Sequence, residues 1–453
     1  MILVGEFILA LFVNRRDLLS PGVIFTSVFS LAALDLVLMQ NYWVVNLSST
    51  TAYIVIFGTG SFLVTSFLVR IIPKAGLNKP DTQKDARIVL GSGATMVFCG
   101  LYGITILSSL LTVRDISIII GGEGGLGSLI GYYNNYSKQS DLDVSLPVWL
   151  SIPYSICTMA GYVWAFIIAD YRSRQQRIPA GAPLLFILAV ITSLSTGSRG
   201  DMISLILCLF VMLIVATRSH AATTGKKFSY IKLIIAIAAV GVTFQTLGTR
   251  LGRDSDQFNF VEYLSIYTGA PLLNLDAWVR LDWPAGQVWG SETLRVLWNG
   301  LGQLFGVPQW EYLTDRAFMT SNGHATGNVG TTFFDYYHDF GLIGVIVMSA
   351  LMGLTMQLGY ERFGRRWRSE SPIGQIVYVF ALFLTARSFF ANSVISTMVS
   401  LGFLKTLAIW ILLVLLFRQS DTLENHIRTN QLQFSRHDRS NSFSSDSIKI
   451  LMR

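Results

Sequence analysis

The string Thr196-Gly-Ser-Arg-Gly200, which stands between two strongly apolar segments, contains an arginine placed to bind an anion. Ser198 and Asp201 have the spacing of a capping box, so a helix is expected to begin at this turn. The guanidinium of Arg199 would then lie beside free backbone N–H groups and the positive end of the helix dipole. Such a group of donors suits a phosphate or another multiply charged oxyanion.

Three more arginines stand at the ends of apolar segments. Arg250 and Arg253 are three residues apart and would share one face if a helix continues through them, and Arg387 lies near the end of a later apolar segment. Charges at a membrane boundary are costly and usually functional, so these arginines are candidates for the same anion site as Arg199. The alternative is that each reaches lipid phosphate or pairs with a local acid, as Arg253 would with Asp254.

A polar segment from residue 324 to residue 339 contains a second group of residues capable of chemistry. It holds two of the five histidines, His324 and His338, together with Asp335 and Asp339. A histidine beside a carboxylate can act as a general base near neutral pH. A zinc site is the competing interpretation, but the two histidines lack the i, i+4 spacing of helical ligands and no cysteine is near. The third interpretation is that these polar residues only order the junction between a loop and a helix.

Two further motifs are less specific. The glycine-rich stretch at 121–127 resembles a phosphate-binding loop, but no Gly-Lys-Ser/Thr follows, which favours a flexible hinge. Asp141 and Asp143 have the spacing of an acidic metal motif, but two carboxylates alone make a poor site for a hard cation. We therefore predict no metal and no cofactor.

The elements that position these residues are expected to be membrane-spanning helices. About half of the residues are apolar, 13% are charged and the mean hydropathy is +0.51. We predict an all-α polytopic membrane protein with one domain over 1–417 and a disordered tail over 418–453. The eleven predicted spans are 2–13, 21–39, 51–69, 88–111, 146–169, 182–197, 202–217, 229–249, 340–359, 373–391 and 398–417.

The distribution of positive charge predicts the orientation of these spans. Most of the 34 lysines and arginines fall in alternate loops and in the tail, a bias typical of the cytoplasmic side. The amino terminus and the regions 112–145 and 250–339 are then expected outside. The net charge of +7 reflects this bias and indicates no nucleic-acid partner. The first apolar run lacks the features of a cleavable signal peptide, and Cys99, Cys157 and Cys208 fall inside spans as expected of core residues.

The long external region at 250–339 is rich in aromatic residues, which argues against disorder. It contains half of the ten tryptophans in the chain, namely Trp278, Trp283, Trp289, Trp298 and Trp310. One interpretation is a set of amphipathic helices on the membrane surface, particularly over 259–280. The other is a platform on which sugar rings stack. Both are compatible.

Together these features resemble the Wzy-type O-antigen and oligosaccharide repeat unit polymerases. The resemblance rests on the arginine turn at 196–200, the long external region, and the polar segment that runs into Tyr337-His-Asp-Phe-Gly-Leu-Ile-Gly344. It covers about 180–400 and depends on the order of the motifs. O-antigen ligases share a similar arginine turn and a later histidine. The resemblance implies a GT-C-like transmembrane glycosyltransferase in the bacterial inner membrane, with its active site facing the periplasm.

The implied reaction is the transfer of a growing glycan from undecaprenyl diphosphate to a repeat unit on the same carrier. Arginines would replace a metal by stabilising charge on the diphosphate. The resemblance implies that Arg199 corresponds to the arginine in the family's turn motif. Arg250, Arg253 and Arg387 correspond to family arginines only in their location at the outer ends of helices. His324 is the first candidate base and His338, beside Asp339, the second. Candidate substrate-binding residues are Tyr267, Asn328 and Tyr337.

The expected partners are lipid-linked glycans and membrane lipids, with a chain-length regulator protein as an additional candidate. Two other activities stay open. An O-antigen ligase would transfer the glycan to lipid A core, so the acceptor distinguishes it from a polymerase. A flippase or other transporter would be expected to line a central cavity with charge and to show two related halves.

Overall fold

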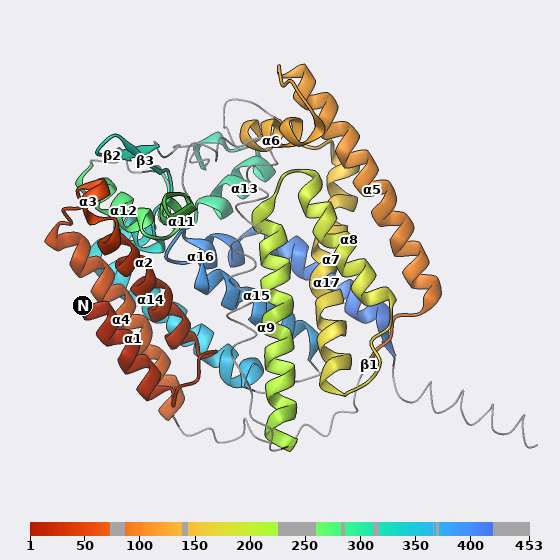
Figure 1. Ribbon diagram of the computed structural model, residues 1–453, viewed down its shortest axis with the longest axis horizontal. Coiled ribbons are helices and arrows are strands. Elements are labelled where there is room, and N and C mark those ends of the chain that lie inside the picture. The colour runs from red at the N-terminus through yellow and green to blue at the C-terminus, as the bar shows by residue number, and fades with distance from the viewer. Residues whose placement is uncertain are drawn as a thin grey trace, which may run out of the picture.

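The computed structural model describes residues 1–72, 87–137, 144–224, 260–281, 286–310, 316, 318–365, 367 and 371–419 (Figure 1). This part of the chain is predominantly helical. Six of its helices are long and apolar enough to cross a membrane: α2 (Pro21–Leu38), α4 (Ser49–Ile71), α5 (Ser92–Ile119), α7 (Val148–Ser173), α9 (Arg199–Thr224) and α14 (Thr332–Gly359). Four shorter apolar helices accompany them: α1 (Ile2–Val13), α8 (Gly181–Ser195), α15 (Pro372–Ala386) and α17 (Leu401–Phe417).

Every predicted span within the described residues coincides with one of these helices, and the span at 229–249 lies outside them. The apolar helices are consistent with a membrane protein. Six helices of the described residues meet the length and hydropathy required to cross a membrane, so the number of eleven spans stays a prediction. Several boundaries differ from expectation. α5 continues to Ile119, and α14 begins at Thr332, ahead of its apolar run. α9 extends beyond the predicted span at both ends, and α15 ends at Ala386.

Short elements gather at one end of the helices, in the upper part of Figure 1. They include α3 (Gln40–Trp43), α6 (Leu126–Tyr136), α11 (Phe260–Thr268), α12 (Ala270–Arg280), α13 (Arg295–Phe305) and the antiparallel pair β2 (Met319–Ser321) and β3 (His324–Gly327). The helical structure expected over 259–280 is thus confirmed by α11 and α12, and their location on the membrane surface stays a prediction. The region 112–145 is not a simple loop, because the end of α5 and all of α6 lie within it.

The remaining elements are small. A 3-10 helix covers Pro308–Trp310, a π-helical turn at Tyr360–Gly364 ends α14, and α16 (Ser393–Met398) precedes α17. At the end of the molecule away from α11, β1 (Arg87–Ile88) pairs with β4 (Arg418–Gln419).

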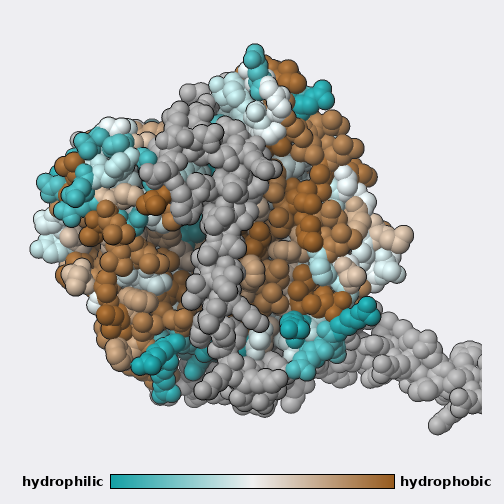
Figure 2. Space-filling model, viewed as in Figure 1, coloured by the Kyte–Doolittle hydropathy of each residue, from teal (hydrophilic) through white to brown (hydrophobic). Residues whose placement is uncertain are grey.

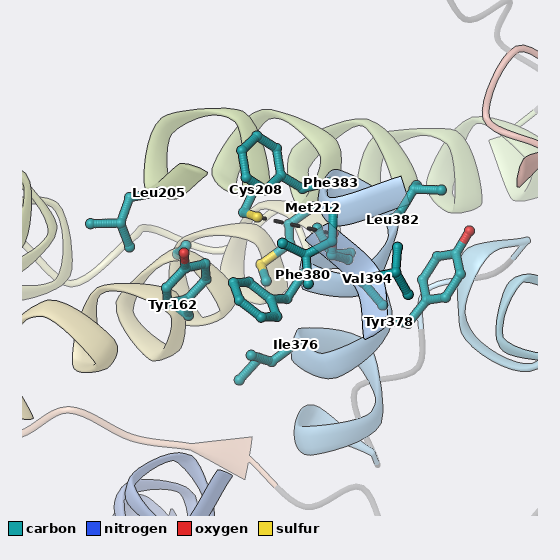
Figure 3. Packing of buried hydrophobic residues seen from close by; sticks show 14 of the residues in the cluster. Tyr162, Leu205, Cys208, Met212, Ile376, Tyr378, Phe380, Leu382, Phe383 and Val394 are labelled. Atoms are coloured by element: carbon teal, nitrogen blue, oxygen red, sulfur yellow. Dashed lines mark hydrogen bonds between the residues drawn. The ribbon is translucent and has the colours of Figure 1, made fainter. Parts of the chain in front are cut away.

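The core forms where α15 packs against α7 and α9 (Figure 3). Phe380 of α15 meets the ring of Tyr162 edge-on, with centroids 5.3 Å apart. The Tyr162 hydroxyl is 2.6 Å from Ser204 Oγ, so its polar atom is satisfied inside the core. The consecutive residues of α7 from Tyr162 to Tyr171 are all buried, which identifies α7 as a central helix surrounded by others.

The surface of the helices is apolar at mid-height. Figure 2 shows hydrophobic residues over α1, α4 and α5, whereas hydrophilic residues gather near β2 and β3 and along the opposite edge. The exposed apolar side chains include Phe12, Val64 and Ile104. An apolar belt between two polar ends is the surface expected of a protein that lies in a bilayer.

Candidate functional site

The arginine turn is held in place by residues of two other helices. Gly197 has a φ of +76°, and a Cβ there would lie 3.0 Å from the Cβ of Asn134, so both the backbone and the space favour glycine. Asn134 of α6 donates a hydrogen bond of 3.3 Å to the carbonyl of Thr196. The Tyr154 hydroxyl of α7 is 2.7 Å from Thr196 Oγ1. The turn is therefore a fixed feature.

Arg199 is the first residue of α9, as the turn motif predicts. Ser198 Oγ donates to Asp201 Oδ2 at 2.5 Å, a bond between the two side chains, whereas a capping box is defined by bonds from these side chains to the backbone. The Arg199 side chain is buried, and its Nη1 donates to the hydroxyl of Tyr263 at 3.4 Å. A buried guanidinium thus lies at the amino-terminal end of a helix, next to α11.

An aromatic path leads from Arg199 to the loop after Arg387. Tyr263 and Tyr267 lie one turn apart on α11 with ring centroids 5.3 Å apart, and Tyr267 stacks on Phe390 at 5.7 Å. Arg387 follows the last residue of α15, and its guanidinium lies over the ring of Phe383 at 5.7 Å. The structure therefore brings Arg199, Tyr267 and Arg387 to one region. Arg250 and Arg253 lie outside the described residues.

His324 lies in a different neighbourhood, at the start of β3. Its ring packs on that of Tyr42 from α3 with centroids 3.8 Å apart. Its Nδ1 is 3.9 Å from Oε1 of Glu262 on α11, and the Tyr42 hydroxyl donates to the same carboxylate. Burial, together with the bond to Glu262, raises the pKa of Tyr42 to about 12, which keeps the phenol protonated and donating.

His338 and Asp339 lie near the start of α14, with His338 Nδ1 3.3 Å from Asp339 Oδ1. Asp339 also accepts hydrogen bonds from the backbone N–H groups of Glu292 at 3.2 Å and Thr293 at 2.6 Å. These bonds tie the segment before α13 to α14. The neighbours of His338 given by these contacts differ from those of His324, so the two candidate bases do not form one site.

Arg316 is a prominent residue that the sequence reasoning missed. Its side chain is 11% exposed and pairs with Glu292 at 2.9 Å and with Asp335. Its guanidinium carbon lies beside the adjoining rings of Trp278 and Phe334, at 5.0 Å and 4.8 Å from their centroids. Burial would lower the pKa of Arg316, but the two carboxylates outweigh it and hold the pKa above its ordinary value.

A signal for this ion group is present in the sequence. Asp335 stands among four aromatic residues, Phe333, Phe334, Tyr336 and Tyr337, and a buried carboxylate requires a cation or hydrogen-bond donors. The burial of Asp335 could therefore be anticipated. The identity of its partner depends on how the segment between α12 and α14 folds.

The other candidate substrate-binding residues are separated. Asn328 is half-buried in the segment after β3, where Asn274 of α12 donates to the carbonyls of Thr326 at 2.9 Å and Val329 at 2.8 Å. Tyr337 is half-buried on α14 and packs against the core. Only Tyr267 lies with the arginine group.

An apolar recess of about 410 Å³ opens among α1, α2 and α4. Its lining includes Gln40, which is two residues before Tyr42, and Leu272 of α12. One residue of its lining, Gln40, thus belongs to the same short helix as Tyr42, which packs on His324.

Among the described residues, no three histidine, cysteine, aspartate or glutamate side chains gather as metal ligands. Asp141 and Asp143 lie outside those residues. In comparisons with known proteins, no family model, curated protein or solved structure matches this chain.

Proposed function

We propose that this protein is a metal-independent glycosyltransferase of the Wzy type, which polymerises undecaprenyl-diphosphate-linked repeat units into a surface polysaccharide at the outer face of the bacterial inner membrane. The observation that carries the proposal is the burial of Arg199 at the amino terminus of α9, against Tyr263. A guanidinium in this position suits a diphosphate. Arg387 adds a second cation in the same region, and Tyr267 offers an aromatic face for a sugar.

In the proposed reaction, the acceptor hydroxyl oxygen forms a bond to the anomeric carbon of the donor glycan. The bond from that carbon to the diphosphate oxygen breaks, and its electron pair leaves with the diphosphate. Arg199 and Arg387 stabilise the charge that develops there, which is the role a metal would otherwise fill. The proton of the acceptor hydroxyl passes to a base, for which His324 is the first candidate.

The test is polymerisation by purified protein in liposomes supplied with lipid-linked repeat units alone. A ladder of longer chains supports a polymerase. Transfer only to added lipid A core indicates a ligase and overturns the proposal. Activity that is lost in EDTA and restored by a divalent cation contradicts the metal-independent mechanism.

Arg199 variants test the chemistry in the same assay. Arg199→Ala should lower the rate on the order of 100-fold or more, as expected for a lost electrostatic contact in the transition state. Arg199→Lys should also be strongly impaired, because lysine keeps the charge but loses the planar fork. Arg114→Ala is the matched control, since Arg114 is about half exposed on α5. Near-normal ladders from Arg199→Ala at equal protein amounts would remove Arg199 from the mechanism.

A further inference from the structure

Three segments that are distant in the sequence meet at His324. Tyr42 comes from α3, Glu262 from α11 and His324 from β3. The Glu262 carboxylate accepts the hydroxyl of Tyr42 and lies 3.9 Å from His324 Nδ1, while the Tyr42 ring supports the imidazole at 3.8 Å. A histidine packed on a ring and facing a carboxylate has the arrangement of an oriented base.

The position of His324 is fixed by contacts other than Glu262. At the end of β2, Ser321 Oγ donates to the carbonyl of Trp43 at 2.6 Å, and in the turn that follows Asn322 Nδ2 donates to the carbonyl of Tyr42 at 3.0 Å. The backbone of α3 therefore holds the β2–β3 turn. A change at Glu262 alone leaves these bonds in place, so its effect on the histidine can be separated from the docking of β3.

The two side chains differ in their access to solvent. His324 is 38% exposed, whereas Glu262 is 12% exposed. An acceptor hydroxyl can therefore approach the imidazole, while the carboxylate lies behind it. The separation of 3.9 Å is longer than a hydrogen bond, and catalytic contacts of this kind often shorten only when substrate binds.

We infer that Glu262 is a positioning residue for His324, an inference that rests on the proposed function. Glu262 accepts the Nδ1–H of His324, which leaves Nε2 unprotonated and directed to the acceptor. During transfer, the acceptor proton moves to Nε2 as the new glycosidic bond forms, and the carboxylate stabilises the resulting imidazolium. The proton then returns to solvent, so His324 is unchanged over the cycle.

α11 connects this base to the arginine group. Glu262 and Tyr263 are adjacent in the chain, and Tyr263 accepts the hydrogen bond of Arg199. One short helix thus contacts both the residue that would receive the acceptor proton and the residue that would stabilise the leaving group. The position of α11 sets the spacing between these two halves of the reaction.

The experiment is a double-mutant cycle in the liposome assay, with kcat and KM measured for the repeat unit. His324→Ala should lower kcat on the order of 100-fold or more, as for a lost general base. Glu262→Gln keeps the shape of the side chain and should lower kcat about tenfold with little change in KM, and Glu262→Asp, which restores the charge, should recover part of that loss. The double variant should be no slower than His324→Ala, because Glu262 acts through the histidine.

Glu361→Gln is the control for loss of a carboxylate, since Glu361 binds Arg365 at the end of α14 away from His324. Additive losses in the cycle, a change in KM alone, or normal rates for His324→Ala would overturn the role of Glu262. If Glu262→Gln does not fold, Glu262→Asp in the presence and absence of His324 gives the same test. Absence of any ladder from the wild-type protein overturns the proposed function itself and is distinct from these outcomes.

Discussion

Arg316 illustrates how a buried charge can hold the segment before α13 to α14. Its partners Glu292 and Asp335 are themselves buried, and the adjoining rings of Trp278 and Phe334 lie against the guanidinium. Removing water from three ionised groups is costly, and the mutual attraction offsets that cost only while all three are present. Arg316 therefore contributes to stability mainly by preventing two buried carboxylates from being unpaired.

We predict that Arg316→Ala destabilises the protein by about 3–5 kcal/mol, the usual consequence of breaking a buried ion pair. The measurement is the free energy of unfolding in detergent. Arg114→Ala is the matched control, because Arg114 and its partner Asp115 are 52% and 62% exposed and the change should cost less than about 1 kcal/mol. Equal, small losses in both variants would show that the Arg316 group is hydrated in solution.

The arginines also show what the sequence could and could not predict. Arg199 is found from the sequence because its turn is encoded by five consecutive residues. Its contact with Tyr263 is not, since that contact joins segments separated by a long stretch of chain. His324 and His338 are close enough in sequence to suggest one site, but the start of α14 and the β2–β3 pair place them with different neighbours.

Gly341 separates a polar first part of α14 from an apolar second part. Before it lie His338, Asp339 and the buried Asp335, and after it lies the apolar run that was predicted from hydropathy. The φ and ψ of Gly341 are 64° and −162°, a combination that other residues adopt only with strain. Hydropathy detects only the apolar part of α14, so the predicted span begins at 340 and not at Thr332.

We expect Gly341→Ala to destabilise the protein by about 1–3 kcal/mol through backbone strain. An added Cβ at Gly341 would meet no atom within 4 Å, so a clash does not contribute. Gly103→Ala in the middle of α5 is the control, because it also has open space but a helical backbone, and it should be neutral or slightly stabilising. Thermal unfolding of the two variants decides the matter, and a neutral Gly341→Ala would contradict the strained geometry.

Asp276 joins α12 to the amino terminus of α4. Its Oδ1 accepts hydrogen bonds from the backbone N–H of Ser48 at 2.7 Å, from Ser48 Oγ at 2.7 Å and from Thr51 Oγ1 at 2.8 Å, and Arg280 pairs with Oδ2. Burial would raise the pKa of Asp276, but these donors outweigh it and lower the pKa below its usual value. The ionised carboxylate is therefore the form that stabilises this contact.

The consequence is a defined dependence on pH. Because the folded pKa is lowered, the stabilisation is fully present above the unfolded value of about 4 and is lost as the pH falls through the folded pKa below it. Asp276→Asn should cost roughly 1.5–3 kcal/mol at pH 6, the range for hydrogen bonds to a charged group. The difference between wild type and variant should shrink below about pH 4. A difference that stays constant down to pH 3 would contradict the role of the charge.

The whole molecule shows a division between what hydropathy predicts and what packing decides. The apolar helices in the described residues were all predicted, because lipid requires continuous apolar segments with internally satisfied hydrogen bonds. Their arrangement was not. The close packing of α14 on α4, and of α15 on α7 and α9, joins segments that are distant in the chain and depends on side-chain shape. The short helices α11 and α12 likewise pack against α2.

The distribution of charge predicts how the molecule is oriented in the membrane. Arg172, Arg174 and Arg177 lie at the end of α7 and in the turn before α8, whereas Trp289 lies in the segment before α13 and is 74% exposed. The bias of positive charge predicts that the three arginines are cytoplasmic and that Trp289 is outside.

Single cysteines at Trp289 and Arg177, in a background with Cys99, Cys157 and Cys208 changed to alanine, should therefore react differently with an impermeant thiol reagent. In intact spheroplasts only the cysteine at 289 should be labelled, and the one at 177 should react after the membrane is permeabilised. Labelling at 177 in intact spheroplasts would invert the orientation and place Arg199 at the cytoplasmic face. The proposed reaction at the outer face would then be untenable.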